Sequence, residues 1–178
     1  MSLRSASVVG LLFFALVATS ILPTPAAEAR KRKRYDIVDT VLYINKRTGE
    51  FDELISALGR AGLVDALRGG PFTVFAPTDK AFENLLKALD LDSVDQIPVD
   101  LLTDVLLYHV TEGRVGYRAF YKNDSLPMLN GSPAHLSQYG FWYLFINDAR
   151  IVYWVIPTSN GNIYVIDQVI LPKETPDS

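Results

Sequence analysis

The sequence lacks cysteine and has little histidine. Without cysteine, it has no disulfide framework, no thiolate metal site and no cysteine nucleophile. Its two histidines, His109 and His135, are too few for a zinc site built mainly from imidazole. Charged residues make up only 21% of the 178 residues and hydrophobic residues 49%, which excludes a disordered polymer. This length and composition indicate one domain, or at most a small pair, with a real core.

Catalytic and metal-binding motifs are also missing. The chain has no nucleophile elbow, P-loop or dinucleotide-binding fingerprint. Asp52 and Glu53 fall on an expected exposed helix face. The acidic stretch with Asp90, Asp92 and Asp95 lacks the glycine and terminal glutamate of a helix-loop-helix calcium site. We therefore expect a protein that is not an enzyme, needs no cofactor or metal and binds no specific nucleic acid.

The first 29 residues are predicted to be a secretory signal peptide. Arg4 supplies a positive start, residues 8–22 are almost wholly apolar, and residues 27–29 (AEA) offer the small side chains of a cleavage site. The apolar run is short for a membrane span and Pro23 ends it, and no later stretch is long enough to span a bilayer. We therefore expect a secreted, extracellular product without a membrane span.

Cleavage after residue 29 would leave five consecutive basic residues, here called the basic arm: Arg30, Lys31, Arg32, Lys33 and Arg34. Adjacent like charges repel, so the arm is expected to be solvated. We favour a leader that keeps the protein soluble. Salt-sensitive binding of polyanionic glycans and cutting by secretory convertases remain open alternatives.

Two further surface features are expected outside the core. Asn123 and Asn130 each begin an acceptor triplet for N-linked sugar, in turn-rich sequence that is expected to be exposed. Residues 173–178 are expected to form a polar tail. The remaining stretch, residues 35–172, contains no linker and no internal repeat, so we expect it to be the folded domain.

Hydrophobic periodicity predicts helices mainly in the first half of this domain and strands in the second. Helical spacing covers residues 37–44, 51–58, 82–89 and 99–107, with Leu85, Leu89 and Leu101 on the expected buried sides. Asp36 is placed to cap the first helix, and Thr78 or Asp79 to cap the third. Strands are predicted at residues 72–76, 108–111, 134–138, 141–146, 149–156 and 162–171.

Asn160 and Gly161 predict a hairpin between the last two strands, because both tolerate the positive φ of a primed turn. In residues 163–166, Ile163 and Val165 would face one side and Tyr164 and Ile166 the other, as in a strand covered on both faces. The overall order indicates an α+β fold, in which N-terminal helices pack on one side or end of a largely antiparallel sheet or sandwich.

Three segments, in order, resemble the fasciclin-like domain family: residues 70–82 (GPFTVFAPTDKAF), 107–110 (LYHV) and 159–172 (SNGNIYVIDQVILP). The match runs from about residue 35 to residue 172. It implies an extracellular adhesion or matrix-interaction module without catalysis. Members of the family are associated with matrix proteins, with receptors such as integrins, and with self-association. Tyr153-Trp154, where an acid is expected, and Tyr164, where histidine is usual, depart from the family pattern and argue against an integrin partner.

Tyr108 and His109 lie where the resemblance suggests contact with a receptor. Because consecutive strand residues point to opposite faces, at most one of them is expected to be exposed. We favour a scaffold role, in which His109 accepts or donates a hydrogen bond at the helix start formed by Thr78 or Asp79. Direct contact of Tyr108 and His109 with a partner is the alternative.

An aromatic hairpin at residues 139–156 is a feature that the family pattern does not require. It holds both tryptophans of the chain, Trp142 and Trp154, and five other aromatic residues: Tyr139, Phe141, Tyr143, Phe145 and Tyr153. Burial on both sides is the interpretation that we favour. The alternative is an open face for self-association, sugar stacking or a hydrophobic ligand. The sequence therefore predicts an adhesion module, with a small-ligand, polysaccharide or lipid binder as the second hypothesis.

Overall fold

The computed structural model describes residues 35–140 and 142–172, apart from the side chain of Trp154. The predicted signal peptide, the basic arm and the polar tail at 173–178 lie outside the described residues. The helices are α2 (Ile37–Thr48), α3 (Asp52–Arg60), α4 (Val64–Arg68), α5 (Asp79–Ala88), α6 (Val99–Leu107) and α7 (Ala119–Lys122), with a 3-10 turn at Val94–Gln96. The strands are β1 (Phe72–Pro77), β2 (Val110–Glu112), β3 (Ser125–Pro127), β4 (Pro133–Tyr139), β5 (Tyr143–Ile146), β6 (Ala149–Pro157) and β7 (Gly161–Ile166). Within the described part, no helix has the length and apolar character needed to cross a bilayer.

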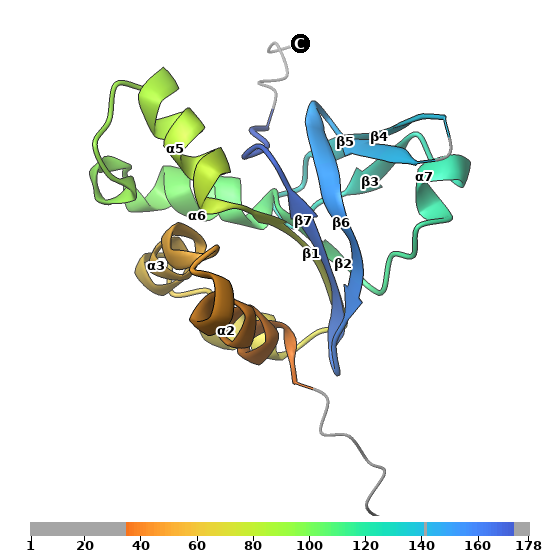
Figure 1. Cartoon of the computed structure of the whole chain (residues 1–178), viewed down its shortest axis with the longest axis horizontal. Coiled ribbons are helices and arrows are strands. Elements are labelled where there is room, and N and C mark those ends of the chain that lie inside the picture. The colour runs from red at the N-terminus through yellow and green to blue at the C-terminus, as the bar shows by residue number, and fades with distance from the viewer. Residues whose placement is uncertain (1–34, 141, 173–178) are drawn as a thin grey trace, which may run out of the picture. The chain divides into compact units, whose positions relative to one another are not determined.

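The seven strands form one sheet in the order β2-β1-β7-β6-β5-β4-β3. All neighbouring strands are antiparallel except β1 and β7, which run parallel with Val74 beside Ile163. Helices α2, α3, α5 and α6 gather on one side of β1 and β7, and β3, β4 and β5 lie on the other (Figure 1). The predicted α+β fold with a largely antiparallel sheet is confirmed.

Two hydrophobic cores lie on the two faces of the central strands. On the helix side, Ile163 and Val165 of β7 pack among residues of α2, α3, α5 and α6. On the other side, Tyr164 and Ile166 pack among residues of β3, β4, β5 and α7. The predicted double-sided coverage of this strand is therefore confirmed. The larger helices therefore cover one face of β7, and the curled sheet together with α7 covers the other.

The motif at residues 70–82 is explained by strand burial and helix capping. Thr78 caps α5, since its Oγ1 accepts a hydrogen bond from the backbone N–H of Ala81 at 3.2 Å. The carboxylate of Asp79 instead caps the neighbouring helix α3, accepting from the backbone N–H groups of Asp52 at 3.2 Å and Glu53 at 2.9 Å. The sequence placed the two caps as alternatives on one helix. The structure uses both, on two helices, and so locks α3 to α5.

Replacing Asp79 with alanine should destabilise the domain by about 1 kcal/mol, because α3 loses its capping carboxylate. This loss of stability should lower the midpoint of urea unfolding, as monitored by far-UV circular dichroism. Asp65 lies in the first turn of α4, which has no side-chain cap, so Asp65→Ala is a matched control. Equal midpoints for the two variants would contradict the capping role.

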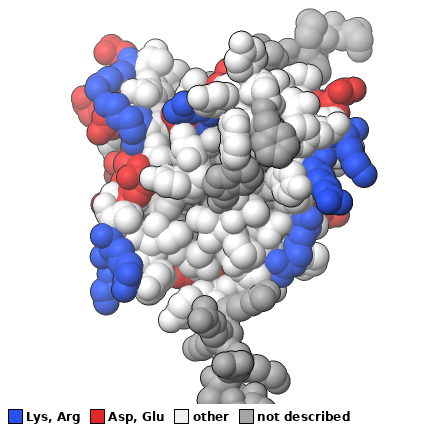
Figure 2. All heavy atoms as spheres, turned by 45° about the vertical axis from the view of Figure 1, so that its right-hand side comes forward, with Lys and Arg blue, Asp and Glu red and all other residues white. Residues whose placement is uncertain are grey.

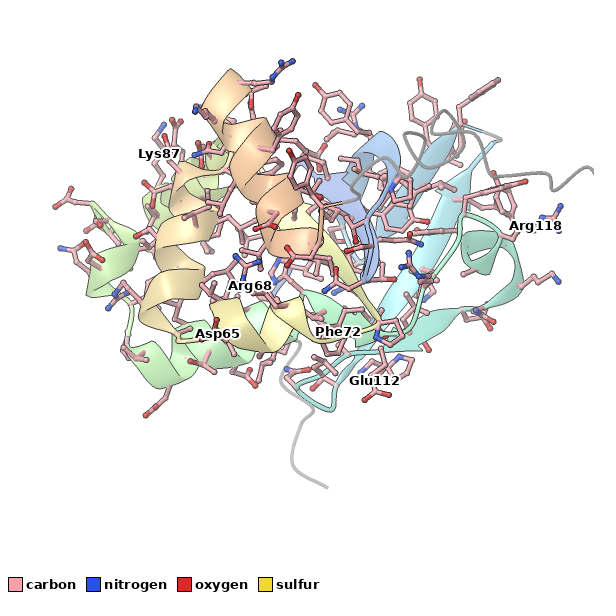
Figure 3. The ribbon with its side chains drawn as sticks, turned by 90° about the horizontal axis from the view of Figure 1, so that it is seen from below. Asp65, Arg68, Phe72, Lys87, Glu112 and Arg118 are labelled. Atoms are coloured by element: carbon pink, nitrogen blue, oxygen red, sulfur yellow. The ribbon has the colours of Figure 1, made fainter. Side chains whose placement is uncertain are left out.

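The hairpin between β6 and β7 exists, but not for the reason that the sequence suggested. Neither Asn160 nor Gly161 has a positive φ. Asn160 acts instead as a junction, because its Oδ1 accepts from the Ile37 N–H at 2.8 Å and its Nδ2 donates to the carbonyl of Leu67 at 2.8 Å. Figure 3 shows the adjoining end of β1, where Phe72 lies beside Glu112 of β2. The turn therefore joins the start of α2, the end of α4 and the first residue of β1.

Candidate functional site

Tyr108 and His109 lie in the turn that ends α6 and not in a strand, so the predicted strand at 108–111 begins two residues too early. Both side chains are only 2% exposed. The Tyr108 hydroxyl donates to the carbonyl of Pro133 and accepts from Nδ2 of Asn147, each at 3.0 Å. These contacts support the scaffold role over direct contact with a partner.

His109 joins the end of α6 to the segment that follows β7. Its Nδ1 lies 2.7 Å from the carbonyl of Val105, and its Nε2 accepts from the backbone N–H of Ile170 at 3.1 Å. A backbone N–H can only donate, so the proton of the neutral ring sits on Nδ1. Burial lowers the pKa of His109 to about 4. The expected bond to Thr78 or Asp79 is wrong, because α6 and the chain after β7 enclose the ring.

Four large aromatic side chains are exposed on β4, β5, β6 and the turn between β4 and β5. Tyr139 is 76% exposed, Trp142 70%, Tyr143 49% and Tyr153 63%, and we call these four residues the aromatic face. Tyr139 and Tyr143 are direct partners across the β4–β5 pair. Figure 2 shows a broad region without charged side chains, with Lys, Arg, Asp and Glu at its margins.

Burial of the aromatic hairpin on both sides, the interpretation that the sequence favoured, is wrong. Leu144 and Ile146 of β5 are buried in the sheet-side core, whereas Tyr143 is exposed and Phe145 is half-buried. The reason lies in the topology. Because the larger helices pack on β1 and β7, only the inner side of β5 is covered among the described residues.

A shallow groove of about 490 Å³ runs beside Tyr139 and Tyr143. Phe145 adds a third ring, and the polar side chains are those of Asp148, Arg150, Asp167 and Gln168. Arg150 Nε lies 3.3 Å from the carboxylate of Asp167, and Gln168 Nε2 donates to the Asp148 carbonyl at 3.2 Å. Sequence reasoning missed these four polar residues, because only the pairing of β5, β6 and β7 brings them beside the rings.

The remaining predicted surface sites are placed as follows. Asn123 is exposed. Asn130 is half-buried, and its Nδ2 lies 3.3 Å from Oδ1 of Asp104. Between residues 35 and 172, with 141 left aside, no three His, Cys, Asp or Glu residues are arranged to hold a metal ion. Polyanion binding by Arg30, Lys31, Arg32, Lys33 and Arg34, and sugar attachment at Asn123 and Asn130, stay predictions.

Together, these observations define an α+β domain with its larger helices on one face of the central strands and with exposed aromatic side chains on β4, β5 and β6. The family model described as "Fasciclin domain" matches residues 49–172. This chain belongs to the fasciclin domain family.

Similar proteins come from bacteria and insects. An uncharacterized protein of Synechocystis is 37% identical over 123 residues, which are 68% of this chain and 89% of that protein. Cell surface glycolipoprotein MPT83 of Mycobacterium tuberculosis is 37% identical over 113 residues, 62% of this chain and 48% of that protein. Among solved structures, a FAS1 domain pair from the insect cell adhesion molecule Fasciclin I matches with a TM-score of 0.51 at 16% identity, over 69% of this chain and 46% of that chain. At this identity, the insect structure supports the fold alone.

Proposed function

We propose that this chain is an extracellular, non-catalytic adhesion module that binds a matrix or cell-surface protein through the aromatic face. The observation that carries the proposal is the exposure of Tyr139, Trp142, Tyr143 and Tyr153 above a buried core. The predicted signal peptide at residues 1–29 supports an extracellular location. The name of one similar protein, cell surface glycolipoprotein MPT83, supports the same role.

Aromatic side chains suit this role for a physical reason. Each offers a large apolar area and has few rotatable bonds, so little conformational entropy is lost when a partner covers it. Tyrosine and tryptophan are for this reason enriched among the residues that dominate interface energies. Four such side chains on β4, β5, β6 and the turn between β4 and β5 offer apolar contact area to a protein partner.

Replacing Trp142 with serine should reduce attachment of cells or matrix proteins to the immobilised protein by at least about tenfold, as expected for an interface anchor. Leu42 on α2 is also exposed but lies on the helix side, so Leu42→Ser is the matched control. Both variants should keep the wild-type urea midpoint. Equal attachment by the two folded variants would contradict the proposal.

A second candidate function is favoured by the groove beside the aromatic face. The negative faces of Tyr139, Tyr143 and Phe145 suit the C–H groups of a sugar ring, and the neighbouring carboxylates and Gln168 can bond its hydroxyls. The charged residues of the groove are Asp148, Arg150 and Asp167, so its net charge is negative. This charge favours a neutral polysaccharide over a polyanion. Two results together would favour this candidate over adhesion. The wild type would be retained on a neutral polysaccharide resin while Tyr143→Ser is not, and the wild type would show no cell attachment.

A further inference from the structure

A separate apolar pocket of about 320 Å³ lies on the helix side, between α5, α6 and the segment after β7. Phe82 and Leu85 line it from α5, Leu101 and Val105 from α6, and Leu171 from the last described segment. Leu89 and Leu101 were predicted to be buried, but both are exposed. They lie at this pocket, and among the described residues no side chain fills it.

The third wall of the pocket is held in place by His109. Its Nε2 accepts from the Ile170 N–H at 3.1 Å, and Val169, Leu171 and Pro172 on either side of Ile170 line the pocket. Because α5 and α6 form the other walls and the sheet supports all three, the pocket is formed before any ligand arrives. Pockets of this size with mostly apolar linings are typical of small-molecule sites.

The polar groups of the pocket limit the chemistry of its ligand. Asp104 is the one charged residue in the described lining, which contains neither lysine nor arginine. The nearest amide, Asn130 Nδ2, lies 3.3 and 3.4 Å from the two carboxylate oxygens, so the carboxylate keeps further acceptor positions. His109 is uncharged near neutral pH, because burial holds its pKa at about 4. A ligand with a carboxylate would find no counter-charge here, whereas a hydroxyl or amine can donate to Asp104.

We propose that this pocket binds a small amphiphile, with an aliphatic chain among the α5 and α6 side chains and a hydroxyl or amine that donates to Asp104. At roughly 30 Å³ for each water-sized group, the volume admits about ten non-hydrogen atoms. None of the four residues of the aromatic face lines the pocket, so the proposal does not rest on the function proposed above.

Titration of the ¹⁵N-labelled protein with nonan-1-ol tests whether the pocket binds an aliphatic chain. We expect saturable amide shifts in residues 101–109 and 169–171, and Leu101→Arg should weaken binding at least tenfold. Val99 on the same helix is similarly exposed, 46% against 54% for Leu101, but lies outside the pocket, so Val99→Arg should bind as the wild type does. Nonan-1-ol is neutral, so the added charge does not bias the comparison. Absence of saturable shifts, or equal affinity of the two variants, would overturn the proposal.

Titrations with nonylamine and nonanoate test the head-group assignment. The wild type should bind nonylamine at least tenfold more tightly than nonanoate, and Asp104→Asn should reduce this ratio severalfold while leaving the affinity for nonan-1-ol nearly unchanged. The amide spectrum of Asp104→Asn shows whether the fold is kept. Tighter binding of nonanoate by the wild type, or an unchanged ratio in the variant, would overturn the role of Asp104.

Discussion

Replacing Gly161 with alanine is expected to prevent the domain from folding. The added Cβ would collide with the backbone carbonyl oxygen of Phe72 and lie 2.7 Å from Cδ1 of Ile37. Phe72 and Gly161 are register partners at the start of the parallel β1–β7 pair, so relief would require separating the two central strands. A backbone collision of this kind belongs among the largest single-residue effects, above about 4 kcal/mol.

Gly59 provides the matched control for this substitution. It lies within α3, where an added Cβ meets nothing within 4 Å. Gly59→Ala should therefore stabilise the domain by roughly 0.5–1 kcal/mol, since alanine favours the helix. Far-UV circular dichroism and urea midpoints distinguish the two variants. Cooperative unfolding of Gly161→Ala near the wild-type midpoint would show that the β1–β7 contact is less close than the structure indicates.

Lowering the pH from about 6.5 to 4 is expected to cost the domain about 3 kcal/mol through His109. Burial lowers the pKa of His109 to about 4 in the folded state, against an ordinary value of 6.5. Between these values the unfolded chain binds the proton more tightly, so stability falls as the pH falls. Protonation also places a second donor at Nε2, opposite the Ile170 N–H, and so breaks that hydrogen bond.

The test compares urea unfolding at several pH values between 7 and 4. Carboxylates titrate in part of this range, so the decisive quantity is the difference between wild type and His109→Gln, which should be less stable at pH 7 but flatter with pH. His135 is exposed on β4, and His135→Gln should keep the wild-type profile. A profile for His109→Gln as steep as that of the wild type would remove His109 as the cause.

The family motifs describe scaffold more than binding surface. Thr78 and Asp79 cap two helices, Asn160 joins three elements, and His109 ties α6 to the chain after β7. Tyr164, which replaces the usual histidine, is buried in a stack with Phe75 and donates to the carbonyl of Val115 at 3.1 Å. Burial raises the pKa of Tyr164 to about 12, so it stays a neutral donor. The four residues of the aromatic face lie outside the three motifs, whereas the apolar pocket is lined in part by motif residues, among them Phe82 and Leu171.

The sequence by itself determined the α+β class, the helix α6 at Val99–Leu107, the cap at Asp36 and the double-sided burial of β7, and it narrowed the cap of α5 to Thr78 or Asp79. These features depend on the spacing of apolar residues and on short-range hydrogen bonds, both of which involve residues that are close together in the sequence. Only the tertiary structure decided that the aromatic hairpin is open and that Leu89 and Leu101 border a pocket. Exposure depends on which distant element covers a face, and here α2, α3, α5 and α6 pack on the other side of the central strands. The partner of His109 was hidden for the same reason, since Ile170 lies 61 residues further along the chain.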